Sequence, residues 1–197
     1  MGCNDLLKLI KNMSSPSGDN ESNSLWTVYY SQYLHAIYVI LDTCDNNSYV
    51  NSDEIFLPLC FLVSHYMELW GKTISKNFGM GDFSGDKATL VSGHHIDALF
   101  DHLGKKAYRD KEIHEKILHV KKLYKILQDL TYDNIPMSEA MRYPVDKKET
   151  PTLSRAVSDT LEWQDFSFNF DYYTDVIKEL MSETIDIYDL AFQEKIH

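Results

Sequence analysis

Three polar side chains that can exchange protons or bind metals lie together in one apolar stretch of the chain. They are His65, Glu68 and Lys72. The surrounding segment, residues 54–77, is otherwise rich in aliphatic and aromatic residues. On a helix, spacings of three and four residues place the three side chains on one face. Such a group could transfer protons or supply half of a metal site. We instead expect a polar network inside the protein, completed by Arg142 or by a histidine of the helix that begins at Gly93, because buried charges need partners.

The other thiols and histidines form no metal-binding pattern. The three cysteines, Cys3, Cys44 and Cys60, contain no CxxC pair, which indicates a reduced, intracellular protein. His94 and His95 are adjacent, so on a helix they point in different directions and cannot bind one metal without distortion. We therefore expect a capping or packing role for these two histidines, and neither a metal nor a cofactor.

The composition indicates one domain with an acidic surface. The chain has 197 residues, of which 44% are hydrophobic, enough for a single substantial core. Its formal net charge is −11, which argues against a broad, nonspecific grip on a nucleic-acid backbone. A local basic patch is the exception, because lysines and Arg109 concentrate within residues 105–125.

Helical spacing of apolar residues predicts a helical bundle organised around residues 54–77. That segment is apolar on several faces, so we expect it to be buried on most sides. Amphipathic helices are predicted at residues 24–44, 110–131 and 172–192, with the first two packed against the central one. A shorter helix after His95 is predicted to stop at Gly104.

The remaining segments are predicted to be irregular. Residues 1–23 read as an N-terminal arm and polar linker, which leaves residues 24–197 as a single helical domain. The glycine-rich residues 79–93 lack the pattern of a phosphate-binding loop and read as a connection. Residues 133–171 contain three prolines and an alternating row of phenylalanines, so we expect a loop or hairpin packed on the bundle.

No segment has the pattern of a membrane span or a leader. The longest unbroken apolar run, residues 55–63, is too short to cross a bilayer. The chain does not open with a basic region followed by an apolar one. We expect a soluble, cytoplasmic protein.

Three short motifs occur in an order that resembles a known family. They are LVSHYMELWGK at residues 62–72, GHHIDALFDHL at 93–103 and MRYPVDKK at 141–148. They are similar to motifs of bacterial helical proteins of the HEPN type. In that family an arginine-histidine-x-x-glutamate-leucine-x-x-lysine helix precedes a Gly-His-x-Leu helix and a Phe-Arg-Tyr-Pro turn. The chain departs from these motifs at Ser64, Ile96 and Met141.

The resemblance implies an all-α, HEPN-like helical bundle, commonly dimeric, from a toxin–antitoxin or antiviral defence system. Many such proteins are metal-independent ribonucleases whose signature is an arginine followed, after four to six residues, by a histidine. Arg109 and His114 fit that signature. The histidine could exchange protons with the ribose 2′-OH, while the arginine neutralises the charge that develops on phosphorus. In the alternative interpretation, both residues lie at an exposed helix start that Asp110 caps.

Two functions follow from these observations. In the first, the chain is a noncatalytic antitoxin, immunity protein or defence-complex subunit whose acidic surface binds a protein partner. In the second, it is a metal-independent endoribonuclease that acts as a homodimer through Arg109 and His114. The net charge favours the first function, and we prefer it. No histidine follows Arg142 at the signature distance, so that arginine offers no second catalytic pair.

Overall fold

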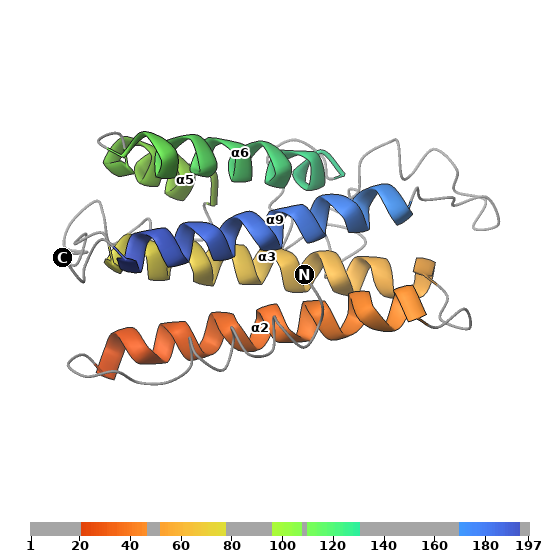
Figure 1. The fold of residues 1–197 in the computed structure, drawn as a ribbon. Coiled ribbons are helices and arrows are strands. Elements are labelled where there is room, and N and C mark those ends of the chain that lie inside the picture. The colour runs from red at the N-terminus through yellow and green to blue at the C-terminus, as the bar shows by residue number, and fades with distance from the viewer. Residues whose placement is uncertain (1–20, 47–51, 78–95, 108–109, 131–169, 194–197) are drawn as a thin grey trace, which may run out of the picture.

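The part of the chain that the structure describes is entirely helical. A computed structural model describes residues 21–46, 52–77, 96–107, 110–130 and 170–193. The helices among these residues, labelled as in Figure 1, are α2 (Glu21–Asn46), α3 (Ser52–Asn77), α5 (Ile96–Lys106), α6 (Lys111–Gln128) and α9 (Phe170–Gln193). No strand occurs among them. The prediction of an all-α fold is therefore confirmed for the described residues.

The described helices pack as a bundle with α3 and α9 in its middle. Figure 1 shows α2 on one side of this pair and α5 with α6 on the other. The colours in Figure 1 show that α3 and α9 run in the same direction, whereas α2 and α6 run in the opposite one. α3 contacts α2, α5 and α9, and α6 packs mainly against α9 and α5. Three different elements therefore cover α3.

The burial of α3 agrees with the prediction for residues 54–77. From Val63 to Ser75 every residue is buried except His65, whose side chain is half-buried. Trp70, the largest of the fully buried side chains, has no exposed area. Gly71 allows α5 to approach closely, because a Cβ atom at this position would overlap the side chain of Leu99. α3 is the central element of the described core.

α2, α6 and α9 each turn an apolar stripe toward the core. On α2 this stripe contains Tyr30, Leu34, Ile37 and Leu41, all buried and separated by three or four residues. α6 begins at a capping residue, Asp110, whose side chain accepts a hydrogen bond of 3.1 Å from the backbone nitrogen of Ile113. The predicted capping role of Asp110 is thus present in the structure.

Polar contacts inside the core join α3 to α9 at Thr184. The hydroxyls of Tyr66 and Thr184 are 2.7 Å apart. The indole nitrogen of Trp70 donates a hydrogen bond of 2.9 Å to the backbone carbonyl of Thr184. Because Tyr66, Trp70 and Thr184 have no exposed area, these bonds satisfy groups that water cannot reach.

Two details of the sequence-based description need correction. Gly104 does not end α5, which continues to Lys106. Glycine is often a helix-stop signal, but here the side chain of His114, on α6, bonds the backbone carbonyl of Gly104. The predicted packing of the 110–131 helix on the central one is also only partly right, since α9 separates most of α6 from α3. The predictions for the N-terminal arm before residue 21, for His94 and His95, for the glycine-rich segment and for residues 133–169 lie outside the described residues. Phe170 and Asp171, which were predicted to be irregular, instead begin α9.

Candidate functional site

One face of α3 carries the polar residues that the sequence singled out. We call Ser64, His65, Glu68, Lys72 and Ser75 the α3 polar stripe. The ammonium of Lys72 lies 2.5 Å from Oε1 of Glu68, and Nδ1 of His65 lies 3.9 Å from Oε2 of the same carboxylate. Only 8% of each of the Glu68 and Lys72 side chains is exposed. The structure therefore brings the three predicted residues together, with Glu68 between the other two.

Aromatic rings surround His65, the stripe's half-buried member. The ring of Tyr33 from α2 meets it edge-on, with 4.7 Å between ring centroids. The ring of Phe61, one helical turn earlier, stacks on it with centroids 6.2 Å apart. The His65 side chain is 32% exposed, so it is the point at which the stripe is closest to solvent.

Tyr124 of α6 reaches the other side of the stripe. Its hydroxyl shares a hydrogen bond of 3.3 Å with Ser64. Burial raises the pKa of Tyr124; the bond to Ser64 lowers it somewhat, and the nearby charges of Asp97 and Glu68 raise it further. The hydroxyl therefore stays protonated. The bond between Tyr124 and Ser64 joins α6 to α3, whereas the ion pair between Glu68 and Lys72 lies within α3.

His114 connects the end of α5 to the start of α6. Its Nδ1 lies 2.9 Å from the backbone carbonyl oxygen of Gly104. A carbonyl can only accept, so in the neutral ring Nδ1 carries the proton and Nε2 holds the lone pair. His114 is half-buried, which corrects the expectation of a fully exposed helix start. Arg109, the other member of the predicted catalytic pair, and Arg142 lie outside the described residues.

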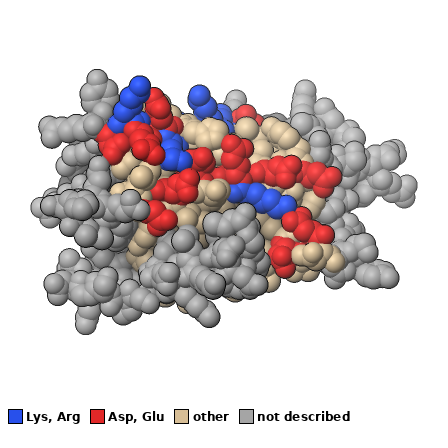
Figure 2. Space-filling view, viewed as in Figure 1, with Lys and Arg blue, Asp and Glu red and all other residues tan. Residues whose placement is uncertain are grey.

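A row of carboxylates covers the outer side of α9. We call Asp171, Asp175, Glu179, Glu183 and Asp186 the α9 acidic face; they are separated by three or four residues and so share one side of the helix. Figure 2 shows acidic atoms gathered across this side of the molecule, over α9. Asp171 and Asp175 are exposed and form no ion pair with the described residues. These residues were not among the predicted site residues, although their spacing is visible in the sequence.

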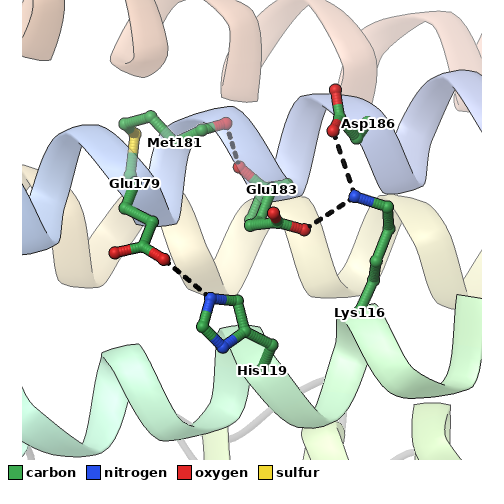
Figure 3. A network of polar contacts seen from close by, with 7 residues as sticks. Lys116, His119, Glu179, Met181, Glu183 and Asp186 are labelled. Atoms are coloured by element: carbon green, nitrogen blue, oxygen red, sulfur yellow. Dashed lines mark hydrogen bonds and ion pairs between the residues drawn. The ribbon is translucent and has the colours of Figure 1, made fainter.

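Side chains of α6 pair with one edge of the α9 acidic face, as Figure 3 shows. The ammonium of Lys116 bonds Glu183 at 2.9 Å and Asp186 at 3.1 Å, and Nε2 of His119 lies 2.8 Å from Glu179. Burial lowers the pKa of Lys116, but its bonds to Glu183 and Asp186 and their charges outweigh this effect and raise it. Lys116 therefore stays charged.

The α9 acidic face remains negative despite these pairs. Glu179 and Asp186 keep 54% and 53% of their side chains exposed. Next to the face, burial and the charge of Asp186 raise the pKa of Asp189. Burial is the larger of these two effects, and the charge of Asp186 adds to it.

Neither a metal site nor a membrane span is found in the described part of the chain. Within the described residues, no group of three or more histidines, cysteines and carboxylates is arranged as metal ligands. None of the described helices is both long and apolar enough to cross a membrane.

Comparisons with known proteins identify no relative. No family model matches the chain, and no curated protein or solved structure is significantly similar to it.

Proposed function

We propose that this chain is a noncatalytic, HEPN-like binding protein that holds a basic protein partner on the α9 acidic face. The observation that carries the proposal is the row of carboxylates along α9. Four of the five are exposed, and two of these, Asp171 and Asp175, form no ion pair with the described residues. An antitoxin, an immunity protein and a defence-complex subunit are the roles that fit such a surface. Cys60, buried and free, suits a reducing, cytoplasmic setting.

The geometry of the face suits a basic polypeptide segment. A helix rises about 1.5 Å per residue, so Asp171 and Asp186 are roughly 22 Å apart along α9. Carboxylates repeated at every helical turn match lysines or arginines repeated at the same spacing on a partner helix. Complementary charges of this kind raise the association rate and select the partner, and salt screens them.

The same charges disfavour nucleic acid on this side of the molecule. The phosphates of RNA would approach a chain with a net charge of −11 across a face that is itself negative. The α3 polar stripe offers no alternative in its described part, because Glu68 and Lys72 are buried and paired with each other. A protein partner is therefore the better match.

The first prediction tests the face with a charge reversal. Changing Asp171 and Asp175 together to lysine should weaken partner binding at least tenfold, about 1.4 kcal/mol. Both side chains are exposed and form no ion pair with the described residues, so the loss of stability should be small, about 1 kcal/mol, from placing a positive charge in the first turn of α9. The measurement is co-purification from the host with a photo-crosslinking residue at Ser182, an exposed position between the carboxylates, followed by mass spectrometry and RNA analysis.

A matched control reverses an exposed carboxylate on another helix. Glu112→Lys changes the charge at the start of α6, away from α9, and should leave the complex intact. Noncovalent binding to the partner that the crosslink identifies should also weaken steeply with added salt. Recovery of RNA instead of protein, or equal loss of the partner in both variants, would remove the α9 acidic face from the function.

A metal-independent endoribonuclease is the second candidate, and the position of His114 favours it. The bond from Nδ1 to Gly104 fixes the ring and leaves Nε2 as the basic nitrogen. A fixed imidazole of this kind is what proton transfer from a ribose 2′-OH needs, and Arg109 would supply the cation for the developing charge. The two candidates share the same fold.

The second prediction separates the two candidates with a degradation assay in EDTA. If the chain cleaves RNA, Arg109→Ala and His114→Ala should each lower the rate at least a hundredfold, because each removes a group that the mechanism needs. His114→Ala should also cost about 1 kcal/mol of stability, since it removes the bond to Gly104. His114→Asn is the matched control: its amide can still donate to Gly104 but cannot shuttle protons. Absence of cleavage by the wild type would leave the binding function alone.

A further inference from the structure

α2 carries a stripe of uncharged residues on the side that faces away from the core. Tyr29, Gln32, Ala36, Val39 and Thr43 follow one another at spacings of three or four residues and so share one side of the helix. The side chains of Tyr29 and Val39 are large and exposed, at 56% and 46%. The hydroxyl of Thr43 donates a hydrogen bond of 2.6 Å to the backbone carbonyl of Val39, so its polar group is already satisfied. We call these five residues the α2 outer stripe.

The α2 outer stripe differs from the other exposed sides of the described bundle. A helix at the edge of a bundle ordinarily turns charged residues to water. Residues 22–41 of α2 instead contain no Asp, Glu, Lys or Arg. Leu118 on α6 and Tyr172 on α9 are also large and exposed, but each has charged residues of its own helix beside it. The α2 outer stripe is therefore the described surface that gains most from being covered by apolar side chains.

The chain that precedes α2 contains an apolar face of its own. Residues 5–13, DLLKLIKNM, lie outside the described residues, and we call them the pre-α2 segment. Their spacing predicts an amphipathic helix, with Lys8 and Lys11 on the polar side. The apolar side would hold Leu6, Leu7, Leu9, Ile10 and Met13. So short a helix is marginal in water, and its apolar side therefore needs a surface to pack on.

We propose that the pre-α2 segment packs as a helix on the α2 outer stripe of the same chain. The connecting residues 14–20, SSPSGDN, are rich in turn-forming residues and reach at most roughly 23 Å, at about 3.3 Å per residue. α2 begins at Glu21, and Tyr29 lies about 12 Å further along the helix. The connection is therefore long enough for the chain to turn back and place Met13 beside Tyr29.

The same lengths determine the direction of the packing. From Met13 back to Asp5 the pre-α2 segment is roughly 12 Å long as a helix, and Tyr29 and Val39 are about 15 Å apart along α2. An antiparallel segment that starts at Tyr29 thus covers most of the stripe. A parallel segment would place Met13 near Val39, about 27 Å from Glu21 and beyond the reach of the connection. Only the antiparallel arrangement fits the chain.

Charge also favours this packing. The pre-α2 segment holds two lysines and one aspartate, whereas the whole chain has a net charge of −11, so the segment is attracted to the bundle. In the antiparallel arrangement its first turn lies near the C-terminal end of α2, where Asp42 is exposed. The positive end of one helix dipole then meets the negative end of the other and the carboxylate of Asp42.

Packing within one chain needs less contact area than binding a second molecule does. The connection keeps the segment close to the stripe, so its effective concentration there is high and no association of free molecules has to be offset. The packing leaves the α9 acidic face accessible, because that face lies on another helix. The inference therefore does not depend on the proposed function.

The third prediction tests the packing by hydrogen–deuterium exchange of the full chain, measured by mass spectrometry. The backbone amides of residues 5–13 should exchange at least tenfold more slowly in the wild type than in Val39→Glu, because a charge in the stripe releases the segment. Ile10→Glu, which changes the segment and not the bundle, should cause the same acceleration. Leu118→Glu is the matched control, since it places a charge at a residue of α6 that is 43% exposed, and should exchange like the wild type. Equal exchange in the wild type and Ile10→Glu, or acceleration by Leu118→Glu, would overturn the proposal.

A disulfide experiment tests the direction and identifies the chain that covers the stripe. In a Cys44→Ser background, Thr43→Cys should form a disulfide with Cys3 of the same chain under mild oxidation, because an antiparallel segment brings Cys3 to that end of the stripe. Gln32→Cys is the matched control and should stay unlinked, since it lies roughly 16 Å from Thr43 along α2. Peptide mapping by mass spectrometry identifies the linked cysteines. Equal linking at both positions, no link at Thr43→Cys, or a disulfide between two chains would each contradict the proposed packing.

Discussion

Replacing Trp70 with alanine should lower the free energy of unfolding by about 3–5 kcal/mol, the range measured when large buried aromatics are truncated. Trp70 has no exposed area, and the centroid of its ring lies 6.3 Å from that of Phe100 on α5. Its indole nitrogen donates a hydrogen bond to the backbone carbonyl of Thr184 on α9. The substitution would remove contacts between α3 and two other helices at once. Urea denaturation followed by circular dichroism measures the loss.

Two variants show whether packing or the hydrogen bond dominates at Trp70. Trp70→Phe keeps an aromatic ring near Phe100 but cannot donate to Thr184, so it should cost less, about 1–2 kcal/mol. Leu118→Ala truncates a residue that is 43% exposed and should change stability by less than about 0.5 kcal/mol. Equal losses for Trp70→Ala and Leu118→Ala would mean that Trp70 does not lie in the core.

Helical spacing was sufficient to predict most of the described fold. The 24–44, 54–77, 110–131 and 172–192 segments lie within three residues of the observed helix ends, because each carries apolar residues at every turn. Gly104 misled the prediction, since a glycine can remain inside a helix when tertiary contacts hold its backbone. Here the side chain of His114 bonds the Gly104 carbonyl, a contact that local sequence does not encode.

The candidate site could be predicted along one helix but not between helices. His65, Glu68 and Lys72 share a face because helix geometry fixes spacings of three and four residues. Tyr124, which bonds Ser64, lies 60 residues away in the chain, and no pattern in the sequence links the two. Contacts of this kind depend on how the bundle is assembled.

The net charge predicted an acidic surface but not its position. The repeat from Asp171 to Asp186 was available in the sequence, yet a repeat alone does not show which side of a helix faces water. In the structure, the burial of Ile177, Leu180 and Thr184 shows that the opposite side of α9 lies in the core, so the carboxylates face water. The structure also shows that Lys116 and His119 of α6 neutralise only one edge of the face.

Replacing Glu68 with alanine should cost about 3 kcal/mol of stability, the lower end of the range for breaking a buried ion pair. The reason is the position of Lys72, whose ammonium lies 2.5 Å from the Glu68 carboxylate with only 8% of its side chain exposed. Without that carboxylate, a charge stays in the interior and loses its closest contact. The midpoint of urea denaturation, with the slope checked for two-state behaviour, gives the change.

The double variant Glu68→Leu with Lys72→Met separates the removal of one charge from the removal of the pair. Because it takes both charges out of the interior and keeps similar volume, it should be close to the wild type in stability or above it. If the two positions are coupled, the double variant should lose far less free energy of unfolding than the sum of the losses of the two single variants. If Glu68→Ala leaves the midpoint unchanged, the Lys72 ammonium must reach water, and the α3 polar stripe would be open to solvent and to a ligand. If the double variant loses as much as the single one, the two charges are held by other groups as well, and the stripe is part of a larger polar network in the bundle.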